Sequence, residues 1–203
     1  MIRRTERNLA RREIRRRRQQ MTPAQRYNAA KFLDRHLAAC PALLRARRVA
    51  IYWPADGEID ITPLARRCRN MGKELFLPVL TPPPGGRMRF APFAWGGRLK
   101  TNRYGIPEPD SPVNGWLRPS QLDLIVIPLV AMDVGGNRIG MGAGYYDKTL
   151  QHIGRRALCP TLLGVGYQFQ LVKKIESQPW DIPLDWLATD QCLRVAGSVQ
   201  KRF

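Results

Sequence analysis

One segment of the chain combines residue types that are suited to binding a phosphate group. It has the sequence GGNRIGMGAGYYDKTL, runs from Gly135 to Leu150 and follows a long apolar run. Glycines let backbone N–H groups approach an anion closely, and the N-terminus of a helix adds partial positive charge. Arg138 before the central glycines and Lys148 after them add full positive charges. The segment therefore predicts an anion-binding loop between a strand and a helix.

The spacing of these glycines leaves a plain tight turn as the alternative. The stretch from Gly140 to Gly144 reads GMGAG, which is not the dinucleotide pattern GxGxxG, and no P-loop lysine follows it. Arg138 is a fork suited to phosphate oxygens, and Tyr145 and Tyr146 offer ring faces and hydroxyls. Asp147 could hold a divalent cation beside phosphates. Alternatively, it could complement the dipole of an early helical turn.

Other candidate residues lie in segments that are distant in sequence. Glu58 follows a predicted strand and could accept hydrogen bonds from an amino-pyrimidine-like ring, or it could be a surface acid. Trp53 and Tyr104 could line such a flat ring, or they could belong to the core. Asp181 and Asp185 flank an Ile-Pro-Leu sequence, and either could be a second cation ligand or a plain loop acid.

Composition limits the classes of protein that this chain can belong to. Its 203 residues, of which 44% are hydrophobic, suit one well-packed domain. No apolar run reaches the roughly 18 residues of a membrane span, and the arginine-rich start lacks the apolar core of a secretion signal. Four scattered cysteines without a CxxC pair argue against a zinc site or disulfide framework and predict a cytoplasmic protein. Only two histidines, His36 and His152, are present, so we expect no chemistry built on histidine.

The net charge points to anionic partners. The chain has 34 Lys and Arg residues against 16 Asp and Glu residues, a formal net charge of +18. Such a surface attracts nucleic acid, nucleotides or poly-acidic small molecules, although a solvated basic surface is the alternative. We therefore keep a basic RNA-binding protein as a rival interpretation, with binding that is weak, salt-sensitive and not specific.

Alternating strand and helix patterns predict the fold. A basic helix is expected at 3–20, with arginines every four residues on one face, and Thr22, Pro23 and Gln25 form the start signal of a second helix that stops before Pro41. A strand at 49–53, a helix at 62–71 with Gly72 as its cap, and a strand at 74–80 form a parallel βαβ unit. Later elements are expected as single strands at 122–132, 161–167 and 186–195, with a short helix to about 153.

These elements predict one α/β domain over residues 1–203, with an open, mostly parallel sheet flanked by helices in a Rossmann-like three-layer arrangement. An insertion at about 81–120 supplies an edge strand at 88–93 and is expected to lie over the ligand edge of the sheet, and the tail 197–203 is expected to fray. Ligands bind at the carboxyl ends of parallel strands. We therefore expect the segment at 53–58, the insertion and the glycine segment to converge there.

Four blocks of this sequence together resemble the 5-formyltetrahydrofolate cyclo-ligase family, also called methenyltetrahydrofolate synthetases. They are GNRIGMGAGYYD at 136–147, YWP with GEID at 52–60, YGIPEP at 104–109 and DLIVIPLVA at 123–131. Their order and spacing fit the family, and the similarity runs from about Arg7 to Val195.

The resemblance implies an enzyme that uses ATP and Mg²⁺ to close 5-formyltetrahydrofolate to 5,10-methenyltetrahydrofolate. In such enzymes the formyl oxygen attacks the γ-phosphorus of ATP, N10 attacks the activated carbon, and phosphate leaves. A family paralogue that acts on another substrate is a further alternative. The implied partners are small molecules, with no membrane.

The resemblance also assigns roles to residues. The implied ATP-binding residues are Arg7, Arg11, Arg138, Ile139, Gly140, Met141, Gly142, Ala143, Gly144, Tyr145 and Tyr146. The implied folate-binding residues are Trp53, Glu58, Met88, Tyr104, Met141, Gly142, Ala143, Gly144 and Tyr145. The implied magnesium ligands are Asp147 and Asp181.

Two positions depart from the family pattern. Many relatives have lysine where Arg7 stands, and the exchange turns a point charge into a fork. Many also have a basic residue within the glycine loop, where this chain has Met141 and Ala143. If a loop cation neutralises charge on the γ-phosphate, Arg138 or Lys148 must replace it.

Overall fold

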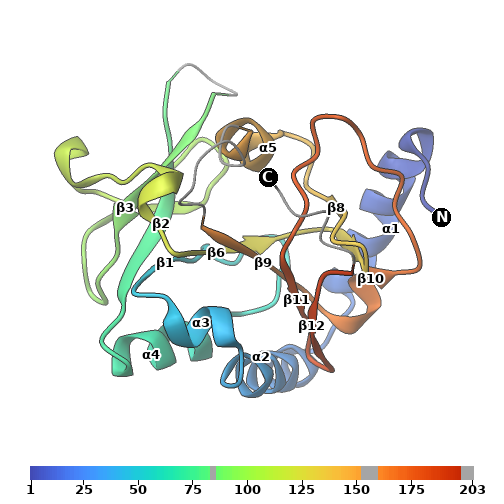
Figure 1. Cartoon of the computed structure of the whole chain (residues 1–203), viewed down its shortest axis with the longest axis horizontal. Helices are drawn as coiled ribbons and strands as arrows, with labels where there is room; N and C mark the ends of the chain where they lie inside the picture. Colours follow the sequence, from blue (N-terminus) through green and yellow to red (C-terminus); the bar gives the residue numbers. More distant parts are fainter. Residues whose placement is uncertain (83–85, 152–159, 198–203) are drawn as a thin grey trace.

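A mostly parallel sheet of seven strands forms the centre of the molecule (Figure 1). The computed structural model describes residues 1–82, 86–151 and 160–197. Five adjacent strands are parallel, and an antiparallel strand closes each edge. In spatial order the strands are β12 (Leu193–Val195), β11 (Trp186–Ala188), β9 (Thr161–Val165), β6 (Leu124–Pro128), β1 (Arg48–Ala50), β2 (Glu74–Leu80) and β3 (Met88–Pro92). The predicted α/β class, the parallel βαβ unit and the edge strand in the insertion are confirmed.

Helices cover both faces of this sheet (Figure 1). On one face lie α2 (Pro23–Leu37), α3 (Pro41–Arg45) and α4 (Thr62–Asn70), and on the other lies α5 (Tyr145–Leu150). Central strands alternate between two apolar cores: Val126 packs on the α2–α4 side, whereas Ile125 and Ile127 pack on the α5 side. Because both faces are covered, these strands are apolar along their whole length. None of the helices in the described parts of the chain is long and apolar enough to cross a membrane.

Local signals set the helix ends as predicted. The backbone N–H of Gln25 donates to the Thr22 hydroxyl at 3.2 Å, and the Gln25 side chain accepts from the Thr22 N–H at 2.8 Å. Pro23 occupies the first helical position of α2, where a missing N–H has no cost. Gly72 follows α4 with φ +69°, a left-handed conformation that terminates helices.

The apolar run at 122–132 is two strands, so the prediction of one strand is wrong. The first, β6, ends at Pro128, and β7 (Ala131–Asp133) belongs to a smaller sheet with β10 (Leu171–Val172) and β8 (Arg138–Ile139). Proline cannot donate to a ladder. At the break, the buried Gln170 amide donates to the carbonyls of Leu129 and Val130 at 2.7 and 2.9 Å. The chain therefore changes sheets without leaving buried carbonyls unpaired.

The segment 186–195 was also predicted as one strand, and this is wrong. Strands β11 and β12 form an antiparallel hairpin. The hydroxyl of Thr189 accepts hydrogen bonds from the N–H groups of Gln191 and Cys192, which closes the turn between them. The predicted short helix ends at Leu150 instead of extending to about 153. His152, Cys159 and the tail from 198 onward lie outside the described residues.

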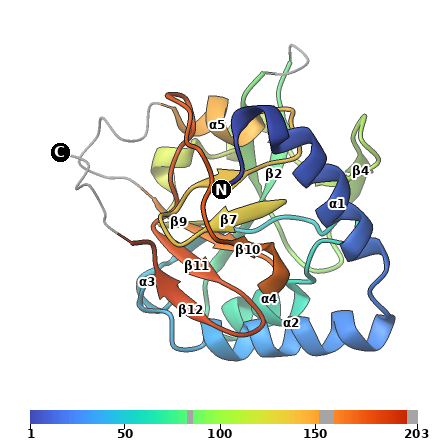
Figure 2. The same cartoon turned by 90° about the vertical axis from the view of Figure 1, so that its right-hand side faces the viewer.

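The basic N-terminal helix stands apart from the main helical layer, beside β7 (Figure 2). It consists of a short turn, η1 (Arg4–Glu6), followed by α1 (Arg7–Gln19). Ile14 supplies its buried apolar contact with Ala131, Ile139 and neighbouring residues. The remaining short elements are β4 (Leu99–Thr101), β5 (Pro107–Pro109), η2 (Val113–Gly115), η3 (Pro119–Gln121) and η5 (Gln168–Gln170).

Candidate active site

The β7–β8 hairpin positions the start of the glycine loop. Its turn is held by the buried carboxylate of Asp133, which accepts hydrogen bonds from the Asn137 N–H at 3.0 Å and the Ile175 N–H at 2.7 Å. Gly136 has φ +88°, and a Cβ atom there would lie 2.7 Å from the Leu184 carbonyl oxygen. Only glycine fits this close approach. The turn thereby fixes Arg138, which lies on β8 and not in the loop as the sequence suggested.

Arg138 and Asp147 form an ion pair across the loop. Nη2 of Arg138 lies 2.5 Å from Oδ1 of Asp147, and its Nη1 donates to the carbonyl of Ile182. The Ile182 N–H in turn approaches the same Asp147 oxygen at 3.4 Å. Because the guanidinium is buried, the carboxylate is needed to compensate its charge.

A second ion pair, Arg7–Asp181, brings the first turn of α1 to the same place. Nη2 of Arg7 lies 2.5 Å from Oδ2 of Asp181 and also donates to the Glu176 carbonyl at 2.8 Å. Ile182 directly follows Asp181, and its N–H approaches Asp147. The backbone at Asp181 therefore lies close to the Asp147 side chain. The other candidate, Asp185, accepts a hydrogen bond from the Leu162 N–H at 2.8 Å, which ties it to β9.

Arg11 supplies a cation to the glycine loop from outside the loop. Its Nε donates to the Gly140 carbonyl at 2.8 Å, and a Cβ atom at Gly142 would lie 3.8 Å from its guanidinium. Burial and the neighbouring Arg7 lower the pKa of Arg11, as expected where positive charges gather without enough anions. The sequence names Arg138 or Lys148 as the replacement for a loop cation. Lys148 does lie against the loop, since a Cβ atom at Gly144 would be 3.8 Å from its Cε, and Arg11 is a further cation there.

The loop is open on its other side. Met141, Gly142 and Ala143 are exposed, and Gly142 and Gly144 have φ values of +109° and +70°. Helix α5 begins directly afterwards but has only six residues, so its dipole is small. Full positive charge at the loop comes from Arg11 of α1 and from Lys148 of α5.

Glu58 is presented by a tight turn after β1. Its N–H donates to the Ala55 carbonyl at 2.9 Å, and its carboxylate accepts from the Ala55 N–H at 3.2 Å. Burial raises the pKa of Glu58 to about 7, although the nearby Arg18 opposes this. Burial, and then the charge of Glu58, raises the pKa of Tyr146. Arg18 contacts both Asp56 and Met141, so the turn that carries Glu58 lies beside the glycine loop.

The insertion contributes a polar aromatic group beside the loop. The rings of Tyr104 and Tyr145 meet edge to face with centroids 6.1 Å apart, and their hydroxyls lie 3.3 Å apart. Arg103 donates to both hydroxyls. Buried Met88 is tied to α5, because its N–H donates to the Thr149 hydroxyl at 2.8 Å. Tyr104 thus lies beside Tyr145 at the exit of the glycine loop, whereas the bond from Met88 goes to the far end of α5.

Trp53 lines a separate cavity of about 260 Å³ under α4. Its ring packs edge to face on Phe93, with centroids 6.4 Å apart, and Phe93 packs in turn on Trp95. This aromatic cavity adjoins the turn that carries Glu58. Trp53 is therefore packed against the core and also forms one wall of this cavity.

Two residues that lie beside the site were missed from sequence, Arg18 and Asp56. Arg18 lies two helical turns after Arg11 on α1, so spacing on a helix face could have placed the two together. Its guanidinium is fully buried and donates to Asp56 at 2.9 Å. The run of four arginines at 15–18 concealed it, because such a run is typical of a solvated helix face.

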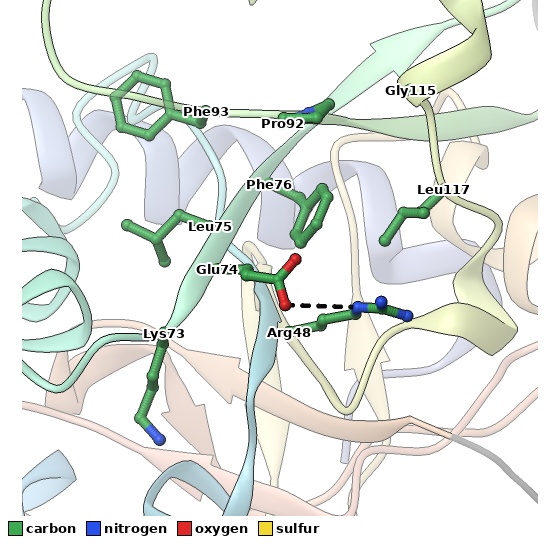
Figure 3. Close-up of a pocket in the computed structure, with 9 residues that line it drawn as sticks. All are labelled: Arg48, Lys73, Glu74, Leu75, Phe76, Pro92, Phe93, Gly115 and Leu117. Carbon is green, nitrogen blue, oxygen red and sulfur yellow. Dashed lines mark ion pairs between the residues drawn. The ribbon is translucent and has the colours of Figure 1, made fainter.

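A larger cavity of about 390 Å³ lies at the opposite edge of the sheet, where β1 and β2 begin (Figure 3). Phe76 and Leu117 line it, and an ion pair between Arg48 and Glu74, with 3.7 Å between Nε and Oε1, crosses it. None of the predicted site residues lines this cavity. Its position away from the carboxyl ends of the strands separates it from the candidate site.

Comparison with known proteins agrees with this geometry. The sequence model of the 5-formyltetrahydrofolate cyclo-ligase family matches residues 3–190. The chain belongs to this family. The cyclo-ligase of Escherichia coli (strain K12) is 37% identical over 176 residues, covering 87% of this chain and 96% of that protein. The cyclo-ligase of Haemophilus influenzae is 35% identical over 172 residues, covering 85% and 91%.

Solved structures support the fold of this cyclo-ligase family member. The NMR structure of Aquifex aeolicus 5,10-methenyltetrahydrofolate synthetase superimposes with a TM-score of 0.80 at 27% identity, covering 97% of this chain and 95% of that one. The Mycoplasma pneumoniae 5,10-methenyltetrahydrofolate synthetase gives a TM-score of 0.71 at 21% identity, which speaks to the fold alone. The resemblance inferred from the four sequence blocks is confirmed.

Proposed function

We propose that the protein cyclises 5-formyltetrahydrofolate to 5,10-methenyltetrahydrofolate at the expense of ATP, releasing ADP and phosphate. Family membership supports the overall reaction. The observation that supports the ATP-dependent route is the gathering of charge at the glycine loop. Arg7 and Arg11 from α1, the Arg138–Asp147 pair and Asp181 come from three distant segments and meet there.

We propose that the arginines hold the phosphates. Phosphoryl transfer depends mainly on positioning and charge neutralisation, so a site that shows no histidine among its described residues is suitable. Arg11 already stands over the exposed glycines, and an incoming triphosphate would compete with Asp181 and Asp147 for Arg7 and Arg138. The glycines leave room for the nucleotide to reach the loop backbone.

Asp147 and Asp181 fit a magnesium ion that is shared with the nucleotide. Mg²⁺ is usually bound by one or two carboxylates together with substrate phosphates and water. Within the described part of the chain, no group of three His, Cys, Asp or Glu side chains could hold a metal unaided. Two carboxylates on residues that approach each other through the Ile182 N–H, completed by phosphate oxygens, would match this pattern. Bound there, the ion would neutralise charge that develops on the transferred phosphoryl group.

We propose that the reduced folate binds between Glu58, the glycine loop and Tyr104. The carboxylate of Glu58 would accept N–H groups of the amino-pyrimidine, while the tyrosine rings of the insertion contact its flat surfaces. The formyl oxygen would then attack the γ-phosphorus at the loop. N10 would attack the activated carbon, and phosphate would leave with that oxygen.

The RNA-binding alternative is less favoured by the structure. Several arginines of the basic helix are already paired within the chain: Arg15 and Arg18 contact Asp56, and Arg16 contacts Glu13. These side chains are occupied by intramolecular partners. An affinity for RNA that persists at high salt would support the alternative.

The experiment that tests the proposed function mixes the purified protein with 5-formyltetrahydrofolate, ATP and Mg²⁺. We expect the absorbance of the methenyl product to appear with one ADP for each product molecule, and neither to appear without ATP. Absence of turnover at every substrate concentration would contradict the proposal and favour a paralogue with another substrate.

A further inference from the structure

Arg18 is a fully buried arginine whose hydrogen bonding is incomplete. Its Nη2 donates to Oδ2 of Asp56 at 2.9 Å and lies 3.7 Å from the sulfur of Met141. Its Nε and Nη1 are buried and have no hydrogen-bond partner among the described residues. Burying a guanidinium with unsatisfied donors is unfavourable, and an apolar side chain would pack there at lower cost. A role in stability alone therefore does not explain this residue.

The partner of Arg18 controls a tight turn. Asp56 has φ +49°, a left-handed conformation that few residues other than Gly, Asn and Asp adopt, and Gly57 follows with φ +71°. The Asp56 carboxylate accepts from Nε of Arg15 at 2.6 Å, from Arg18, and from the Gln19 amide at 3.2 Å. Three donors from one end of α1 thus hold the turn in this conformation.

The turn formed by Asp56 and Gly57 also holds Glu58 in position. The Glu58 N–H and carboxylate are both bonded to Ala55, on the other side of the turn. A Cβ atom at Gly57 would lie only 3.4 Å from Cβ of Arg18, so the turn packs directly against the helix. Movement of Arg18 would consequently move the proposed folate carboxylate.

The same helix contacts the proposed nucleotide loop. Arg11 is bonded to the Gly140 carbonyl, and Arg18 contacts Met141, the next residue. Helix α1 therefore connects the glycine loop, which is expected to bind phosphate, with the turn that carries Glu58, which is expected to bind the pterin. The Arg18 guanidinium contacts Met141 in the loop and Asp56 in the turn.

We infer that Arg18 and Asp56 are positioning residues that couple the two substrate sites, so that nucleotide and folate each strengthen the binding of the other. The inference rests on the proposed function. When ATP orders the glycine loop, Met141 fixes the position of Arg18, Arg18 fixes Asp56, and the turn then holds Glu58 in place. When folate binds Glu58 first, the same contacts order the glycine loop. Such coupling is reciprocal by thermodynamic necessity.

The test is a calorimetric titration of a non-hydrolysable ATP analogue with Mg²⁺, in the presence and absence of 5-formyltetrahydrofolate. For the unchanged protein we expect the folate to tighten nucleotide binding by about 5- to 20-fold. In Asp56→Asn this factor should fall to about 1, while the affinity for the analogue alone changes less than about 3-fold. Asparagine tolerates the left-handed conformation, so the variant removes the charge and retains the turn.

Arg18→Met should also lose the coupling, and its folding is checked by circular dichroism. Arg16→Met is the matched control, because it removes an exposed arginine of the same helix and should keep the coupling. A folded Asp56→Asn protein with unchanged coupling, or an unchanged protein without coupling, would overturn the inference. If the unchanged protein bound neither ligand, the proposed function itself would be wrong.

Discussion

Arg7 and Asp181 form a largely buried ion pair, with 2.5 Å between Nη2 and Oδ2, although 174 residues separate them in the sequence. Arg138 and Asp147 repeat the relationship at the same distance. In both pairs, an arginine expected to contact phosphate holds a carboxylate expected to contact the metal. These two arginines are thus charge-compensated before substrate arrives. Paired charges can be buried where unpaired ones would ionise poorly or unfold the chain.

Replacing Asp147 with asparagine should lower kcat by about 10²- to 10³-fold, which is typical for the loss of one electrostatic contact to a transition state. The side chain keeps its shape but loses the charge proposed to hold the metal. Methenyl formation at saturating substrates measures the effect. A kcat within about 3-fold of the original protein would contradict the role of Asp147.

A stability control separates this role from the ion pair. Asp147→Ala leaves Arg138 buried without its carboxylate and should destabilise the protein by about 3 kcal/mol in urea unfolding. The double variant Arg138→Met with Asp147→Ala should recover most of that stability but no activity. Recovery of activity in the double variant would show that Asp147 serves only to balance Arg138.

Arg11→Met should raise the KM for ATP by at least about 10-fold, because the loop itself contains no cation and Arg11 stands over it. Arg12→Met is the control, since Arg12 is exposed on the adjacent helix position. Steady-state kinetics at saturating folate make the comparison. Equal effects of the two substitutions would indicate a general loss of positive charge and not a specific contact at the loop.

The half-buried carboxyl of Glu58 should make stability depend on pH. Its pKa is about 7 in the folded protein against an ordinary value of 4.5. Between these values the folded state holds a proton that the unfolded state has released, so stability falls as pH rises from about 4.5 to about 7. The loss should be on the order of 2 kcal/mol. Glu58→Gln should abolish it in urea unfolding at pH 5 and pH 8, and an unchanged pH dependence in that variant would contradict the burial argument.

Activity should show the opposite trend with pH. If the ionised form of Glu58 accepts the N–H groups of the pterin, kcat/KM for folate should rise through pH 7, since this ratio reports groups of the free enzyme. Glu58→Gln should have a low kcat/KM that does not rise near pH 7. If the variant keeps most of the activity and the same rise of kcat/KM near pH 7, Glu58 does not bind the folate.

The fold could be predicted wherever a local signal decided the structure. Thr22 and Pro23 start α2, and Glu74 to Leu80 form β2, because a cap and an apolar run are enough. The break between β6 and β7 depends instead on a hydrogen bond from Gln170, 41 residues from Leu129. An apolar run buried on both faces has no periodicity that could reveal such a break.

The site could be predicted in part. Residue types indicated the glycine loop, and the resemblance assigned roles to it and to Arg11, but no local signal shows that Arg11 bonds to Gly140, 129 positions away. Nothing local distinguishes Arg18 from the arginines beside it, because burial is decided by what the helix packs against. The pairing of each proposed metal ligand with an arginine is likewise a tertiary feature.

The central claim is that the glycine loop brings the γ-phosphate to the formyl oxygen, and isotopic labelling tests it most directly. The substrate is 5-formyltetrahydrofolate with ¹⁸O in the formyl group, incubated with ATP and Mg²⁺ for a time too short for exchange with water. Mass spectrometry then measures the released phosphate. The account predicts one ¹⁸O atom in each phosphate, since the formyl oxygen leaves on phosphorus. Unlabelled phosphate, with ¹⁸O recovered in water, would contradict it.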